Sequence, residues 1–123
     1  MKTLFLFSIA CILFLSCRKK NTDDKQAPVI TLTTPVNNQV LTPGEIHIKG
    51  MVTDNQYIDQ VHIEITNLNT SEEYKHVHIH PGTKTYAFDQ TITVQAGINY
   101  KIKIIAEDPS ANPASAQVEV SCN

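Results

Sequence analysis

Between residues 27 and 123, apolar and polar residues alternate with a period of two in short stretches that end at proline, glycine or asparagine. This alternation is typical of β-strands that bury one face, because successive side chains of a strand point to opposite faces of the sheet. No stretch shows helical periodicity longer than one turn. We therefore expect seven strands, at residues 29–34, 45–53, 57–66, 74–80, 85–94, 99–106 and 114–121.

Seven short strands in one domain favour two antiparallel sheets that pack face to face, and a closed barrel is the alternative. One aromatic residue supports the two-sheet arrangement. Tyr100 opens the sixth expected strand, directly after a turn at residues 96–97. Immunoglobulin-like domains place a tyrosine at this point, with its hydroxyl against backbone a few residues upstream.

The run YKIKIIAED at residues 100–108, followed by Asn112, resembles the end of many bacterial immunoglobulin-like and fibronectin type III-like domains. Residues 27–30 and 53–55 match the beginning and middle of the same families. The chain has Ala111 where glycine is common in them. The resemblance implies an all-β, seven-stranded antiparallel immunoglobulin-like sandwich but no particular function. Within this group the chain looks most like small lipoprotein-anchored domains of unknown function.

The N-terminal segment has the composition of a signal peptide. Lys2 precedes an apolar stretch at residues 4–15, which at twelve residues is shorter than the roughly twenty that a helix needs to span a bilayer. Ser16 and Cys17 then follow, and this order resembles the lipobox of bacterial lipoproteins, in which the cysteine is acylated, commonly with palmitate. The resemblance implies that residues 1–16 are removed and that Cys17 carries lipid.

Residues 18–26 (RKKNTDDKQ) contain no aliphatic side chain, so residues 17–26 are expected to be a charged flexible tether and residues 27–123 the folded domain. The expected location is the bacterial cell envelope, on the outer membrane, facing the periplasm or the surface. The domain contains five lysines and ten acidic residues, a net charge of −5, which argues against nucleic acid as a partner. Cys11 would leave with the signal peptide and Cys17 would carry the lipid, so Cys122 has no cysteine to pair with and no disulfide is expected within the mature chain.

Three histidines alternate with aliphatic residues near the middle of the domain. His76, His78 and His80 flank Val77 and Ile79 in the segment YKHVHIHPG. The period of a strand sends the two aliphatic side chains toward the core and the three imidazoles to the opposite face. An ordinary strand with one solvated face has this pattern too.

The preceding strand supplies further candidate ligands. If residues 67–73 close a hairpin centred near residue 70, His62 lies opposite His78, and Glu64 lies opposite His76. Side chains directly opposed on one face have Cβ atoms about 4.5–5.5 Å apart. Slipping this register by one residue would move every side chain to the other face.

One ion cannot bind all three histidines of the strand, because His76 and His80 are about 13 Å apart along it. A site for Zn²⁺ or Cu²⁺ would use His62, Glu64, His76 and His78, with His80 at its rim.

A calcium site is a weaker candidate. Asp54, Asp108 and Asn112, together with Glu107, lie near expected strand ends and offer oxygen ligands. Aspartate and asparagine are also the ordinary residues of turns, where they bond to their own backbone. Turn formation is therefore the favoured interpretation of these residues.

No pairing of a nucleophile with a base is recognisable, so we expect no enzymatic activity. The function predicted from the sequence is a lipid-anchored binding or interaction module with an unidentified protein or glycan partner and no required cofactor. The alternative is an envelope lipoprotein that binds Zn²⁺ or Cu²⁺ through the histidines. Adjacent imidazoles would also make such a face sensitive to acid.

Overall fold

Eight β-strands and no helix make up residues 23–123, the part of the chain that this computed structural model describes. The strands are β1 (Val29–Thr34), β2 (Val40–Leu41), β3 (Gly44–Thr53), β4 (Gln60–Asn67), β5 (Glu72–Ile79), β6 (Thr85–Val94), β7 (Asn99–Glu107) and β8 (Pro113–Cys122). The predicted signal peptide and Cys17 lie outside the described residues. Nothing within residues 23–123 forms a helix long and apolar enough to cross a membrane.

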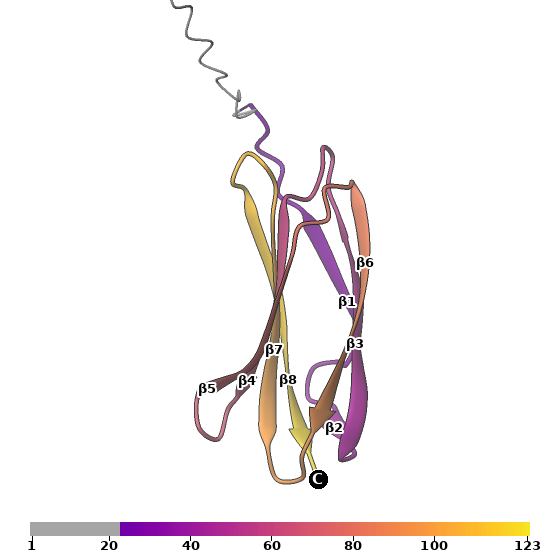
Figure 1. The fold of residues 1–123 in the computed structure, drawn as a ribbon, viewed down its shortest axis with the longest axis vertical. Coiled ribbons are helices and arrows are strands. Elements are labelled where there is room, and N and C mark those ends of the chain that lie inside the picture. The colour runs from indigo at the N-terminus through magenta and orange to yellow at the C-terminus, as the bar shows by residue number, and fades with distance from the viewer. Residues whose placement is uncertain (1–22) are drawn as a thin grey trace, which may run out of the picture.

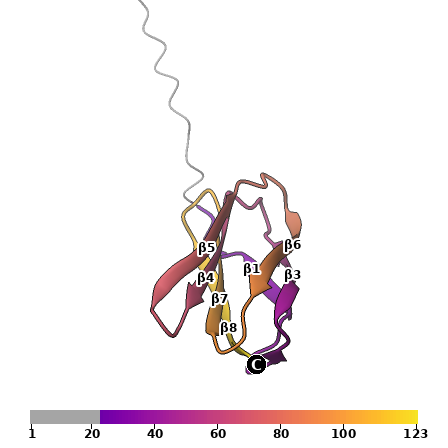
Figure 2. The same cartoon turned by 60° about the horizontal axis from the view of Figure 1, so that its bottom comes forward.

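The strands form two sheets, a three-stranded sheet in the order β1-β3-β6 and a five-stranded sheet in the order β2-β8-β7-β4-β5. Figure 1 shows the sheets as two layers, and Figure 2 shows the same layers with the lower end of the molecule turned forward. The predicted all-β class is confirmed, and the two layers make a sandwich-like domain.

The predicted number of seven strands, all antiparallel, was wrong. The eighth strand is β2, whose two residues pair in parallel with Ser121 and Cys122 of β8. A strand of two residues shows no alternation, so the period of two could not reveal it. The predicted strand at 57–66 also begins later, at Gln60, because Ile58 instead exchanges backbone hydrogen bonds with the turn between β5 and β6.

Both sheets bury alternate side chains in one shared core. The fully or almost fully buried apolar residues are Leu41, Ile48, Val52, Ile58, Val61, Ile63, Ile65, Phe88, Ile92, Val94, Tyr100, Ile102, Ile104, Ala106, Val120 and Cys122. Burial of apolar surface stabilises the fold by roughly 25 cal/mol per Å². On β4 it fixes the direction of every side chain, because burying Val61, Ile63 and Ile65 turns His62 and Glu64 outward.

Tyr100 occupies the position expected from the sequence. Its ring is fully buried, and its hydroxyl accepts a hydrogen bond from the backbone N–H of Gln95, five residues upstream, at 3.1 Å. The Tyr74 ring packs against it in a T-shaped arrangement with the ring centroids 5.5 Å apart. These contacts tie the turn between β6 and β7 to the core and close the side of the domain where β5 lies.

Candidate metal centre on the histidine face

The β4–β5 hairpin has the register predicted from the sequence. His62 lies opposite His78, and Glu64 lies opposite His76. A shift of one residue follows between Ile65 and Thr66, beyond these pairs. The pairing thus brings side chains from two strands onto one outward surface, which we call the histidine face and define as His62, Glu64, His76, His78 and His80.

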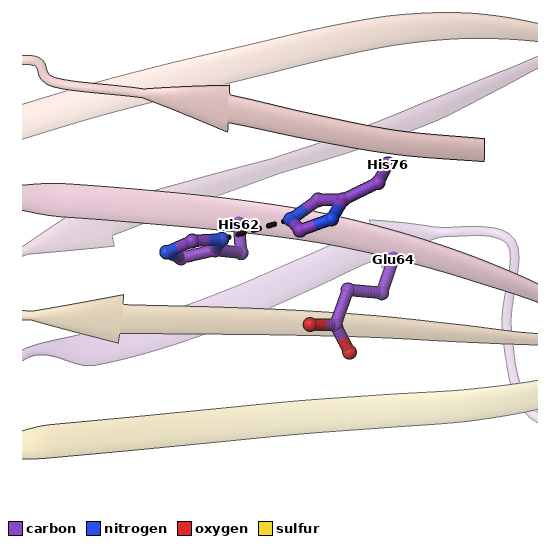
Figure 3. Close-up of side chains that lie close together, drawn as sticks. All are labelled: His62, Glu64 and His76. Carbon is purple, nitrogen blue, oxygen red and sulfur yellow. Dashed lines mark hydrogen bonds between the residues drawn. The ribbon is translucent and has the colours of Figure 1, made fainter. Parts of the chain in front are cut away.

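His62 and His76 are the closest pair on the histidine face. Nδ1 of His62 lies 2.9 Å from Nε2 of His76, so one nitrogen donates a proton and the other accepts it (Figure 3). Together with Glu64, these residues each place a donor atom within 4.8 Å of the others. The two nitrogens and the carboxylate therefore form a compact donor set that no single strand could supply.

The remaining two histidines lie outside this donor set. The His78 ring stacks on His62 with centroids 4.0 Å apart, and its Nε2 lies 3.2 Å from Oε1 of Gln60. His80 Nδ1 lies 3.0 Å from the backbone oxygen of Asp59, to which it donates. Of the residues expected to bind one ion, the structure thus brings together His62, Glu64 and His76, turns His78 toward Gln60, and leaves His80 at the rim.

The electrostatic environment favours the neutral form of the central imidazole. Partial burial lowers the pKa of His62, and the neighbouring His78 and His76 lower it further, against the opposing influence of Glu64. A histidine binds metal through a neutral imidazole nitrogen. His62 is therefore held in the protonation state that a metal ligand requires near neutral pH.

Glu73 is a neighbour that the sequence did not reveal. Its Oε2 lies 3.5 Å from Nδ1 of His76, on the opposite side of the ring from the nitrogen that faces His62. A carboxylate at the distal nitrogen of a ligating histidine fixes the ring orientation and increases its basicity. Glu73 and His76 are three residues apart, a spacing that would normally place them on opposite faces of a strand. The pairing of β4 with β5 is irregular at this point, because Ile65 pairs with Lys75 but the next residue, Thr66, pairs with Glu73. This irregularity lets the side chains of Glu73 and His76 meet.

A second group of donor atoms lies at the end of the domain where the chain enters. Asp54 and Asp108, both predicted from the sequence, have carboxylate oxygens within 4.8 Å of Asp24. The turn chemistry expected for Asp108 is confirmed, because its Oδ1 accepts hydrogen bonds from the backbone N–H groups of Ser110 and Asn112, each at 2.9 Å. Asp24 was not predicted, since its segment has the composition of a solvated tether.

Fold and site together define a small all-β domain of two sheets that carries a histidine cluster on the outer face of one hairpin. The chain belongs to the family described as Domain of unknown function (DUF4625), whose model matches residues 15–120. No curated protein sequence matches it. It is similar in structure to an engineered protein with a crystal structure at 1.98 Å resolution, with a TM-score of 0.56 and 11% identity over 78% of this chain. The chain spans 20% of that protein's length, and at this identity the similarity concerns the fold alone.

Proposed function

We propose that the domain binds a divalent transition-metal ion on the histidine face, with His62, Glu64 and His76 as its ligands. The observation that carries the proposal is the convergence of two imidazole nitrogens 2.9 Å apart with a carboxylate whose donor atom lies within 4.8 Å of both. Nitrogen and carboxylate donors of this kind suit Zn²⁺, Cu²⁺ and Ni²⁺. Three protein ligands also leave at least one position open for water or a further group.

The distance between the nitrogens bears on the choice of metal. With bonds of about 2.0–2.1 Å, two ligands at a tetrahedral angle are about 3.3 Å apart, and two ligands at 90° are about 2.9 Å apart. The separation of 2.9 Å between His62 Nδ1 and His76 Nε2 matches the 90° arrangement. Tetragonal nitrogen and oxygen sites favour Cu²⁺, whereas Zn²⁺ would require the two rings to separate by a few tenths of an ångström.

The proposed setting is a lipid-anchored protein of the bacterial envelope. It is supported by the apolar stretch at residues 4–15 and the following Ser16-Cys17. The buried Tyr100, with its hydroxyl bonded to the backbone of Gln95, supports assignment of the fold to the immunoglobulin-like and fibronectin type III-like group. We propose binding rather than catalysis; the thiol of Cys122 is only 1% exposed and so is not an accessible nucleophile.

The proposal is tested by titrating the full chain, purified in a nonionic detergent, with Cu²⁺ and Zn²⁺ in an isothermal calorimeter. One ion per chain should bind with sub-micromolar affinity, and His76→Ala should weaken binding at least about 100-fold, since even loss of an outer-shell partner costs 10–100-fold. The matched control is His80→Ala, which removes an imidazole of the histidine face that lies just beyond the end of β5 and outside the donor set. It should leave the affinity within about threefold of the wild-type value.

Two outcomes would refute metal binding at this site. One is the absence of binding at millimolar metal. The other is an equal loss of affinity in His76→Ala and His80→Ala, because that would show a diffuse attraction of metal to exposed histidines instead of a defined donor set.

The second candidate is recognition of a protein or glycan on the same face without metal. The observation that favours it is the position of β5, which carries His76 and His78 and is the edge strand of its sheet. This candidate predicts that the full chain cosediments with an envelope fraction in the presence of EDTA and that His78→Ala weakens the association. Association that requires added Cu²⁺ or Zn²⁺ would instead support the metal site.

A further inference from the structure

A polar hollow of about 280 Å³ lies between the turn that precedes β2, the loop between β4 and β5, and the adjoining ends of β7 and β8. Figure 1 shows these segments at the end of the domain that holds the C-terminus, with the first described residues at the other end. We call it the amide hollow, and its lining residues are Asn38, Leu68, Asn99, Glu119, Val120 and Ser121.

Strand alternation turns the polar side chains of the amide hollow away from the core. Tyr100 of β7 and Val120 of β8 pair with each other and are buried between the sheets. Their neighbours Asn99, Glu119 and Ser121 therefore face the outer side of the five-stranded sheet. Asn99 and Ser121 are also directly opposed, so their Cβ atoms are about 4.5–5.5 Å apart and both side chains can reach one ligand.

Hydrogen bonds hold the backbone around the amide hollow. The Asn38 N–H donates to the backbone oxygen of Glu119 at 2.7 Å, and the Glu119 N–H donates to Oδ1 of Asn37 at 2.9 Å. The Asn99 N–H donates to Oδ1 of Asn69, also at 2.9 Å. The turn, the two strands and the loop are thus fixed relative to one another before a ligand enters. Such preorganisation lowers the entropy cost of binding.

The polar side chains of the amide hollow, in contrast to its backbone, are available to a ligand. Four of them form no hydrogen bond or ion pair within residues 23–123, namely the amides of Asn38 and Asn99, the carboxylate of Glu119 and the hydroxyl of Ser121. Amide and hydroxyl groups both donate and accept hydrogen bonds, whereas a carboxylate only accepts. A ligand that bonds to all four must carry several groups that both donate and accept, and neighbouring hydroxyls have this property.

Charge and size narrow the choice of ligand. Glu119 is the one charged residue of the lining, and its carboxylate repels an anion. The lining also includes Leu68 and Val120, which give the hollow apolar surface for the C–H groups of a ring. Pockets for drug-sized ligands have volumes of about 300–1,000 Å³, so the volume of about 280 Å³ suits a single ring and its substituents.

We infer that the amide hollow binds one neutral sugar residue through its hydroxyls. Asn99 and Ser121 lie side by side and bond to neighbouring hydroxyls, while Glu119 accepts a hydrogen bond from a third. Because the hollow lies opposite the end where the described chain begins, a sugar can approach it without meeting the tether (Figure 1). The inference does not depend on metal binding, because the amide hollow shares no residue with the histidine face.

Saturation-transfer difference NMR tests the inference on the full chain in a detergent without a sugar headgroup. The neutral probes are glucose, galactose, mannose and N-acetylglucosamine. A ligand with roughly a dozen non-hydrogen atoms should bind with a Kd of about 1–10 mM, and at least one of the four probes is expected to do so. Asn99→Ala should weaken that binding at least about fivefold, which is the effect of one lost hydrogen bond.

Two further variants make the test specific. The matched control is Gln95→Ala, which removes an exposed amide in the turn between β6 and β7, outside the hollow, and should leave the Kd within about twofold. The anionic sugar glucuronate should bind at least about threefold more weakly than glucose, and Glu119→Gln should remove this difference because it removes the repelling charge. Equal urea midpoints of Asn99→Ala and the wild-type chain exclude unfolding as the cause of lost binding.

Four outcomes would overturn the inference. The first is that none of the four neutral probes binds at 100 mM, and the second is that Asn99→Ala and Gln95→Ala bind them alike. The third is that glucuronate binds the wild-type chain as tightly as glucose does. The fourth is that a triglycine blocked at both ends binds more tightly than every sugar, because the hollow would then recognise the amides of a peptide.

Discussion

The turn between β7 and β8 contains a strained residue whose replacement should stabilise the protein. Ala111 has a φ of +63°, its side chain is exposed, and its N–H donates to the Asp108 backbone oxygen at 3.1 Å. The left-handed conformation costs an L-residue about 1–2 kcal/mol. Ala111→Gly removes this strain without loss of packing, but the greater freedom of glycine in the unfolded chain costs about 0.5–1 kcal/mol.

The midpoints of these two ranges give a net gain for Ala111→Gly of about 0.75 kcal/mol, which corresponds to a rise in Tm of about 3–6 °C for a domain of this size. Thermal unfolding followed by circular dichroism in EDTA measures it without a contribution from bound metal. The matched control is Ala87→Gly, also exposed but within β6, where φ is not positive. There the same substitution should destabilise by about 0.5–1 kcal/mol. Equal destabilisation by the two substitutions would refute the reasoning.

Three further predictions concern the histidine face and the core. The pKa of His62 is lowered in the folded state, so the folded protein binds fewer protons and should lose stability as the pH falls below about 6.5. Urea midpoints between pH 7.5 and 5 should fall less in His62→Gln, and equal slopes would contradict the assignment. Ile63→Ala, at a fully buried position of β4, should cost about 2–5 kcal/mol in urea unfolding, and a cost below 1 kcal/mol would show that the core does not pack as described. Tyr100→Phe leaves the N–H of Gln95 without its partner and should cost about 1–3 kcal/mol; an unchanged midpoint would show that water replaces the hydroxyl.

The register of the β4–β5 hairpin was predictable because several constraints agreed. The aliphatic residues of both strands had to face the core, which fixed the side on which each histidine lies. The polar loop then fixed the pairing of His62 with His78. Only the rotation of side chains remained undetermined. His78 turns toward Gln60, although strand geometry alone allowed it to join His76.

Other features depend on contacts that leave no periodic pattern. Val40 and Leu41 form a strand only because the backbone of β8 lies beside them. Asp24 comes from a segment whose composition is that of a tether, and its place in the acidic cluster follows from hydrogen bonds to residues 55 and 112. Such long-range contacts are decided by the packing of the whole domain, which local propensity does not specify.

The histidine face and the acidic cluster lie next to each other along the five-stranded sheet. β4 begins at Gln60, which pairs with Glu107, and Asp108 of the acidic cluster follows directly. His80 reaches back to the Asp59 backbone, so the histidine face starts next to the end where the tether enters.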